Sequence, residues 1–281
     1  MTKYVSPPVN VAVLGPGGVG GLLAAVLPNA LVVSRSPIEE IRLRSVILGD
    51  RSTAVRSTRR LDEPVDVLFV ATKATGLADA VERIETQPGV VVPLLNGFEH
   101  IPWLRERFAD VVAATIRVEA TRVAPGVIEQ TSPFLRIELS AHPEVADLLN
   151  DAGIPAVVVE NEAQVMWSKL VRLNAIALTT TAFRAPIGTV RDHHRDDLLD
   201  VVRETAAVAA AEGATVDVPA IAQELREAHP ELLSSMARDA AAGRPLELDA
   251  IGGAVLRAGA RHGIATPTVE RLVEAIRSEL P

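Results

Sequence analysis

Residues 15–20 carry the glycine pattern G-x-G-x-x-G, which constrains the fold more than any other stretch of this chain. The pattern follows the mostly apolar residues 9–14 and precedes a second apolar run at residues 22–27, as in a strand, a tight turn and the start of a helix. Such turns bind a dinucleotide, because they let a pyrophosphate approach the backbone at the positive end of the helix. The predicted binding residues are Gly15, Pro16, Gly17, Gly18, Val19 and Gly20. The alternative is a turn that binds nothing.

Apolar runs alternate with helical stretches as far as residue 116. The further runs are residues 30–33, 65–72, 89–95 and 111–116. This alternation is typical of a parallel sheet covered by helices. We expect a short helix at residues 39–44, and an antiparallel pair at residues 127–131 and 135–139 that extends the sheet.

Beyond residue 161 the sequence predicts helices alone. We expect them at residues 164–183, 191–211, 219–228, 232–242, 248–262 and 269–278. The predicted fold class is therefore an α/β N-terminal Rossmann-type domain, residues 1–161, followed by an all-α C-terminal domain, residues 162–281. The long helix at 191–211 would suit a dimer surface and an internal core equally well, so a homodimer stays open.

Composition excludes several classes of function. Acidic residues outnumber Lys and Arg by 36 to 28, for a net charge of −8, which argues against general nucleic-acid binding. Without cysteine, thiolate catalysis and disulfides are excluded. No apolar run approaches the roughly 18 residues that span a bilayer, and residues 1–8 show no apolar signal core. We therefore expect a cytoplasmic protein with no membrane partner. The adjacent His193 and His194 would point about 100° apart on a helix, so no metal site is predicted.

Polar residues follow the predicted strands. NAD-binding sites place an acidic residue about 20 positions after the glycines, where this chain has Arg35, preceded by Ser34. Because a guanidinium binds phosphate in a bidentate way, Ser34 and Arg35 predict NADP; alternatively, Arg35 is a solvated arginine at a strand end. Lys73 and Asn96 follow two later strands, at the edge where such sheets bind ligands, so both are candidate cofactor-binding residues. Alternatively, they are solvated or form turns.

Further segments carry a resemblance to a known family. They are Gly15–Gly20, Thr72-Lys73-Ala74, Leu95-Asn96-Gly97, Trp167-Ser168-Lys169-Leu170, the run from Ser234 to Asp249, Gly252-Gly253-Ala254-Val255, His262-Gly263-Ile264 and Thr266-Pro267. With these segments in this order, the chain resembles the ketopantoate reductase family, the 2-dehydropantoate 2-reductases of pantothenate biosynthesis. The resemblance implies reduction of the C2 ketone of a 2-oxo acid, with NADPH as the cofactor.

The resemblance also implies roles for individual residues. Lys169 matches the catalytic lysine that protonates the developing alkoxide, and Glu247 matches the acid that orients it. Asn96 and Ser235 match residues that hold the substrate, and Lys73 matches a lysine beside the nicotinamide end of the cofactor. These roles agree with general chemistry, because a positioned ammonium stabilises negative charge on the ketone oxygen and a neighbouring carboxylate keeps that ammonium charged.

The helix after Lys169 departs from the family pattern. The family carries asparagines four and eight residues after the lysine, where this chain has Leu173 and Ala177. On a helix, Asn174 would lie about 140° from Lys169 and Thr180 about 20° from it, and both are candidate substrate-binding residues. Three functions therefore stay open: a ketopantoate reductase, a reductase of a more apolar 2-oxo acid, and a non-catalytic NADP-binding sensor.

Overall fold

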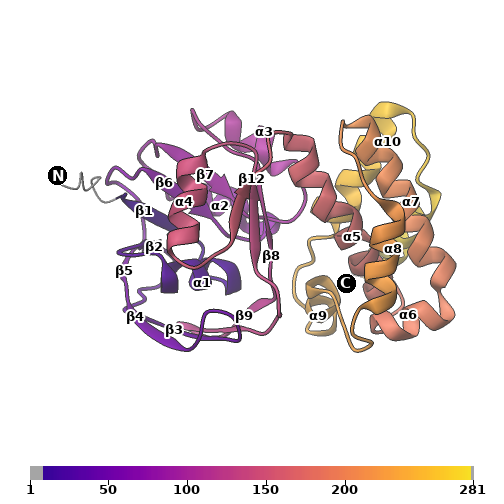
Figure 1. Cartoon of the computed structure of the whole chain (residues 1–281), viewed down its shortest axis with the longest axis horizontal. Helices are drawn as coiled ribbons and strands as arrows, with labels where there is room; N and C mark the ends of the chain where they lie inside the picture. Colours follow the sequence, from indigo (N-terminus) through magenta and orange to yellow (C-terminus); the bar gives the residue numbers. More distant parts are fainter. Residues whose placement is uncertain (1–8, 280–281) are drawn as a thin grey trace, which may run out of the picture. The chain divides into compact units, whose positions relative to one another are not determined.

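The structure is a computed structural model, which describes residues 9–279. Residues 1–8, on which the expected lack of a signal core rests, lie outside the described residues. The chain divides into two compact units (Figure 1). The first holds the residues up to Leu95 together with His100–Glu160, and the second holds Asn96–Glu99 together with the residues from Asn161 onward.

A five-stranded parallel sheet forms the centre of the first unit, in the order β5-β2-β1-β6-β7. Its strands are β1 (Val11–Leu14), β2 (Leu31–Val33), β5 (Arg56–Thr58), β6 (Val67–Val70) and β7 (Val90–Pro93). The winding direction reverses between β1 and β6, where open α/β sheets bind their ligands. Val11 and Val13 pack into one apolar cluster and Ala12 and Leu14 into another. The strand is therefore buried on both faces, which explains its unbroken apolar sequence.

Helices and two smaller sheets complete the first unit. The helices are α1 (Gly18–Val26), the short η1 (Ala74–Gly76), α2 (Leu77–Val81), α3 (His100–Arg105) and α4 (Pro143–Asp151). One smaller sheet has the order β4-β3-β10-β9 and the other β12-β11-β8. Their strands are β3 (Glu40–Ser45), β4 (Arg51–Ala54), β8 (Ala114–Arg117), β9 (Ala120–Ala124), β10 (Val127–Gln130), β11 (Arg136–Leu139) and β12 (Ala156–Val158).

Two local expectations in this unit are wrong. Residues 39–44 do not form a helix: residues 40–45 form β3, in which Ile41 and Leu43 are buried between exposed charged residues. That alternation has the period of a strand. The segments 127–131 and 135–139 do not pair with each other. Instead, β10 pairs with β3 and β9, whereas β11 pairs with β8 and β12.

The second unit is helical, which confirms the expected fold class. Its elements are α5 (Glu162–Ala182), α6 (Ile187–His193), α7 (Arg195–Ala211), α8 (Val218–Glu227), α9 (Ser235–Ala241), the π-helical turn η2 (Asp249–Gly253), α10 (Ala254–His262) and α11 (Pro267–Ser278). The central helix is α5 (Figure 1). It packs against α6, α7, α9, α11 and η2. Asn161 begins α5 by accepting a hydrogen bond from the N–H of Gln164 at 3.1 Å.

The helix expected at residues 191–211 is broken at His194, whose backbone leaves the helical region between α6 and α7. The His194 ring stacks on Phe183, with ring centroids 3.6 Å apart. The apolar side of α7, including Leu198, Val201 and Val208, is buried within the unit. This long helix is therefore a core element. In the part of the chain that the structure describes, no helix combines the length and apolar character needed to cross a membrane.

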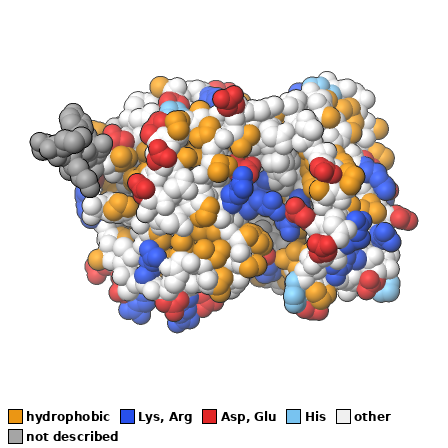
Figure 2. All heavy atoms as spheres, viewed as in Figure 1, with side chains coloured by type: hydrophobic (Ala, Val, Ile, Leu, Met, Phe, Trp, Pro, Cys, Tyr) orange, Lys and Arg blue, Asp and Glu red, His pale blue; other side chains and the backbone are white. Residues whose placement is uncertain are grey.

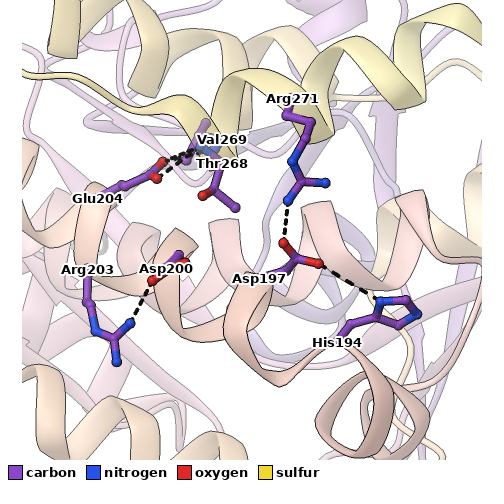
Figure 3. A network of polar contacts seen from close by, with 8 residues as sticks. All are labelled: His194, Asp197, Asp200, Arg203, Glu204, Thr268, Val269 and Arg271. Carbon is purple, nitrogen blue, oxygen red and sulfur yellow. Dashed lines mark hydrogen bonds and ion pairs between the residues drawn. The ribbon is translucent and has the colours of Figure 1, made fainter.

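Charged side chains of both signs are interspersed on the visible face of the helical unit (Figure 2). Several form ion pairs between helices, including Asp197 of α7 with Arg271 of α11 (Figure 3). In the same network, the Glu204 carboxylate accepts hydrogen bonds from the backbone N–H groups of Thr268 and Val269, at distances from 2.9 to 3.0 Å. These N–H groups lie in the first turn of α11, where they lack partners within the helix. Glu204 therefore caps α11 from another helix.

We expect Glu204→Ala to lower the free energy of unfolding by about 1–2 kcal/mol, because it removes the acceptor for two helix-end N–H groups. Asp200→Ala is a matched control on the same helix, since Asp200 makes an exposed pair with Arg203 of a kind that contributes about 0–1 kcal/mol. Urea unfolding followed by circular dichroism measures both. Equal losses in the two variants would contradict the capping role.

Candidate functional site

Three of the glycines in the 15–20 turn are required by the packing of the protein itself. Gly15 has φ +89°, and a Cβ there would lie 2.6 Å from Thr72 Cγ2. A Cβ on Gly18 would lie 2.0 Å from the Ala120 carbonyl oxygen, and one on Gly20 would lie 2.2 Å from the Gly15 carbonyl oxygen. All three distances are too short for any side chain, so these residues must be glycine whether or not a ligand binds.

Gly17 differs from its neighbours. A Cβ on Gly17 would meet only the Ala71 carbonyl oxygen within 4 Å, at an ordinary 3.9 Å, so protein packing leaves room for a side chain. Gly17 is also the N-cap of α1, whose first N–H groups favour an anion. The open space at Gly17 fits a pyrophosphate group of a dinucleotide. The neighbouring Pro16 is partly exposed, and Val19 packs against the apolar core of the first unit.

A buried hydroxyl supports the same fit. Thr72 lies against Gly15, and its Oγ1 is buried without a hydrogen-bond partner among the described residues. Buried polar atoms in proteins are nearly always satisfied, so an orphaned hydroxyl beside the glycine turn suits a ligand. Lys73 follows Thr72 after the end of β6 and is exposed. The sequence did not single out Thr72 as a binding residue, because a hydroxyl at a strand end is common.

Arg35 lies just beyond the end of β2, exposed and without an ion pair to another described residue. Ser34 is buried, and its hydroxyl donates to the Ser36 carbonyl oxygen at 2.5 Å, which closes the turn after the strand. The parallel pairing of β2 and β5 aligns Val33 with Thr58. Arg59 therefore follows the neighbouring strand at the same edge of the sheet and is also exposed. Sequence reasoning missed Arg59, since nothing local shows that these strands are neighbours.

The second unit brings three of the predicted site residues together. The Lys169 ammonium donates a hydrogen bond to Asn96 Oδ1 at 3.0 Å, and Asn96 Nδ2 donates to Glu247 Oε2 at 2.9 Å. We call this chain of hydrogen bonds the Asn96 bridge. An amide oxygen can only accept and an amide nitrogen can only donate, so the cation and the carboxylate determine the orientation of the amide. Glu247 is only 8% exposed, whereas Lys169 and Asn96 are partly exposed.

The Asn96 bridge adds one contact to what the sequence predicts. We expected Glu247 to orient Lys169, and expected Asn96 to bind substrate and cofactor. In the structure the Asn96 amide joins Lys169 to Glu247, because Asn96 belongs to the same compact unit as both. This arrangement holds an ammonium group in a defined place, partly exposed, beside a buried carboxylate. It can therefore stabilise a developing oxyanion and deliver a proton to it.

The predicted hydroxyl groups are those of Thr180, in α5, and Ser235, in α9, and both lie near the start of α9. Thr180, which is fully buried, donates to the Ile176 carbonyl oxygen at 2.6 Å, and its hydroxyl lies 2.8 Å from that of Ser234. Ser234 in turn caps α9 by accepting from the N–H of Ala237 at 2.9 Å. Ser235 is exposed at the first position of this helix. Thr180 thus supports the helix end, while Ser235 has an accessible hydroxyl.

Asn174 lies in the packing between α5 and α7. It is fully buried, and its Nδ2 donates to Thr205 Oγ1 at 2.9 Å. This orientation agrees with its wide angular separation from Lys169 on the helix. Leu173 is partly exposed and Ala177 is fully buried. One turn after Lys169, the helix therefore has an apolar side chain.

Across residues 9–279, no three or more His, Asp or Glu side chains gather into a group that could hold a metal ion. His193 ends α6, and His194 is engaged with Phe183.

Comparison with known proteins gives matches along nearly the whole chain. Residues 11–144 match the family described as "Ketopantoate reductase PanE/ApbA", and residues 161–279 match "Ketopantoate reductase PanE/ApbA C terminal". The chain is 32% identical to a 2-dehydropantoate 2-reductase of Caulobacter vibrioides, over 96% of this chain and 98% of that one. For a Mycobacterium tuberculosis 2-dehydropantoate 2-reductase the identity is 31%, over 94% and 95%.

A solved structure agrees with these matches. The PanE/ApbA family ketopantoate reductase from Ralstonia eutropha JMP134 superposes with a TM-score of 0.84 at 25% identity, covering 96% of this chain and 97% of that one. The resemblance drawn from the sequence segments is confirmed.

Proposed function

The chain belongs to the ketopantoate reductase family, whose members are NADP-dependent oxidoreductases, and from this premise we propose that it reduces the C2 ketone of 2-dehydropantoate with NADPH. The observation that carries the proposal is the Asn96 bridge, which keeps an ammonium group in a defined position. Relatives named 2-dehydropantoate 2-reductase, matched over nearly their full length, support the choice of substrate.

In this proposal Lys169 donates the proton, and the other two residues of the Asn96 bridge position that lysine. When bound, NADPH supplies the hydride that adds to C2 of the 2-oxo acid. The Lys169 ammonium stabilises the negative charge that develops on the ketone oxygen and donates the proton that completes the alcohol. Asn96 accepts one of the three ammonium N–H bonds and so orients the other two. The Glu247 carboxylate holds the Asn96 amide in the orientation that accepts from lysine.

Other residues would hold the two ligands. We assign the pyrophosphate to the backbone around Gly17 and the start of α1, and the 2′-phosphate to Arg35, with Arg59 beside it. The exposed Ser235 hydroxyl is assigned to the substrate carboxylate. In this assignment Lys73 lies near the nicotinamide end of the cofactor.

The decisive experiment measures NADPH oxidation at 340 nm with 2-dehydropantoate and with 3,3-dimethyl-2-oxobutanoate, which lacks only the terminal hydroxyl. We expect higher kcat/KM for 2-dehydropantoate. Because Leu173 and Ala177 stand where the family has asparagines, a preference for the analogue without the hydroxyl would instead show a reductase of a more apolar 2-oxo acid. Tight NADPH binding without turnover of any 2-oxo acid would show a nucleotide sensor.

We expect Lys169→Ala to lower kcat by about 10²–10⁴-fold, the usual contribution of a general acid, with little change in NADPH affinity. Lys169→Arg separates charge from proton donation, because a guanidinium keeps the charge but does not release its proton in this pH range. It should therefore remain well below wild type. Steady-state kinetics and NADPH fluorescence titration supply the two readouts, and an unchanged kcat in Lys169→Ala would rule out its role.

We expect Arg35→Gln to weaken NADPH binding by about 10- to 100-fold, since hydrogen bonds to a charged group contribute about 1.5–3 kcal/mol. NADH binding should be unaffected, because NADH has no 2′-phosphate. Arg42→Gln, which removes an exposed arginine paired with Glu40 on β3, is the control. The dissociation constants come from fluorescence titration, and equal affinity of Arg35→Gln and wild type for NADPH would refute the assignment.

A further inference from the structure

The short segment Asn96–Glu99 packs against the helical unit along its whole length. Gly97 has φ +81°, and a Cβ there would lie 2.2 Å from the Ala250 carbonyl oxygen in η2. Phe98 packs on Trp167 of α5, with ring centroids 4.9 Å apart. The segment begins at the Asn96 bridge and ends at Glu99, so whatever holds Glu99 also restrains the amide that contacts Lys169.

Glu99 is held by a forked ion pair from Arg257 of α10. Arg257 donates from Nε to Glu99 Oε1 at 2.9 Å and from Nη2 to Glu99 Oε2 at 2.5 Å. The other side of the same guanidinium donates from Nη1 to Asp249 Oδ1 at 2.8 Å. Hydrogen bonds to Glu99 and then to Asp249 raise the pKa of Arg257 above its usual value. The guanidinium therefore stays charged throughout the pH range of any assay.

The backbone around Asp249 is shaped to admit this arginine. Asp249 begins the π-helical turn η2, whose widened ladder joins the N–H of Ala254 to the Asp249 carbonyl oxygen. Turns of this kind occur frequently at functional sites. A Cβ on Gly253 would lie 2.7 Å from Asp249 Oδ1 and 3.2 Å from Arg257 Nη1, so a glycine here leaves room for the pair. Glu247, two residues before Asp249, lies at the other end of the Asn96 bridge.

We propose that Arg257, by joining Glu99 to Asp249, is a positioning residue that keeps the Asn96 bridge aligned. The role rests on the proposed function, because alignment of Lys169 affects turnover only if Lys169 is the proton donor. Each carboxylate that Arg257 binds is close in sequence to a residue of the Asn96 bridge. Glu99 ends the segment that begins at Asn96, and Asp249 begins the turn that follows Glu247. A planar guanidinium fixes two carboxylates in direction as well as distance.

A purely stabilising role does not account for this arrangement. The side chains of Arg257, Glu99 and Asp249 are 44%, 36% and 76% exposed, and ion pairs this exposed contribute little to global stability. The bidentate Arg257–Glu99 pair has the geometry in which an exposed ion pair can still restrain its neighbours. A displacement of about 1 Å at a reacting group lowers rates strongly.

The kinetic test compares Arg257→Gln and Arg257→Lys with Arg261→Gln. Arg261 is the matched control: it lies on the same helix, is 51% exposed and pairs with Glu212 at 2.9 Å. We expect Arg257→Gln to lower kcat at least tenfold with NADPH affinity unchanged, and to shift the limb of the pH–rate profile that reports Lys169. Arg257→Lys should recover part of the loss, because it keeps the charge but not the fork. Arg261→Gln should match wild type.

A double-mutant cycle tests whether Arg257 affects turnover through Glu99. If Arg257 acts through Glu99, then Glu99→Gln and Arg257→Gln break the same link, and the double variant should lose little more than Arg257→Gln alone. Losses that multiply, or an Arg257→Gln enzyme with the kcat and pH profile of Arg261→Gln, would overturn the proposal.

A readout independent of turnover uses Trp167, which is 2% exposed and packs on Phe98. The chain has two tryptophans, so Trp103→Phe leaves Trp167 as the single reporter. In that background Arg257→Gln should increase acrylamide quenching of Trp167 fluorescence, and Arg261→Gln should not. A wild type that binds NADPH but reduces no 2-oxo acid would overturn the proposed function, while quenching still decides whether Arg257 holds the segment. Unchanged quenching would show that it does not.

Discussion

The arrangement of the Asn96 bridge depends on how the buried Glu247 carboxylate obtains its hydrogen bonds. Glu247 is almost fully withdrawn from water, and an ionised group in such a place needs hydrogen-bond donors. The Asn96 amide supplies one, and in doing so turns its oxygen toward the Lys169 ammonium. A neutral side chain thus connects two opposite charges that come from distant parts of the sequence. The hydrogen bonds of the same amide hold the Lys169 ammonium in place.

The glycines of residues 15–20 are required for two different reasons, protein packing and ligand binding. Gly15, Gly18 and Gly20 leave no space for a Cβ against neighbouring protein atoms, whereas Gly17 does. A pattern that looks uniform in the sequence therefore contains two kinds of requirement. Within residues 15–20, only the missing side chain of Gly17 calls for an explanation outside the protein, and the buried, unpartnered Thr72 hydroxyl nearby points to the same ligand.

The parallel sheet, the helical second half and the family could be predicted from the sequence, because each leaves a local signal: unbroken apolar runs, helical periodicity and ordered motifs. The helix expected at residues 39–44 was wrong because the strand alternation of Ile41 and Leu43 was overlooked. The partners of β10 and β11, the proximity of Arg35 to Arg59 and the position of Asn96 between Lys169 and Glu247 depend on pairings between distant residues. No local pattern encodes them, so they needed the structure.

Asn96–Glu99 belongs to the second unit, although the residues on either side of it belong to the first. This has a consequence for recombination between related genes. The N-terminal family match, residues 11–144, carries Asn96, while the C-terminal match, residues 161–279, carries Lys169 and Glu247. A gene fusion that exchanged the two halves between distant relatives would therefore bring together side chains that had not been selected as a set. The boundary between the two family matches separates Asn96 from Lys169 and Glu247 in the sequence, so recombination there could disturb the Asn96 bridge.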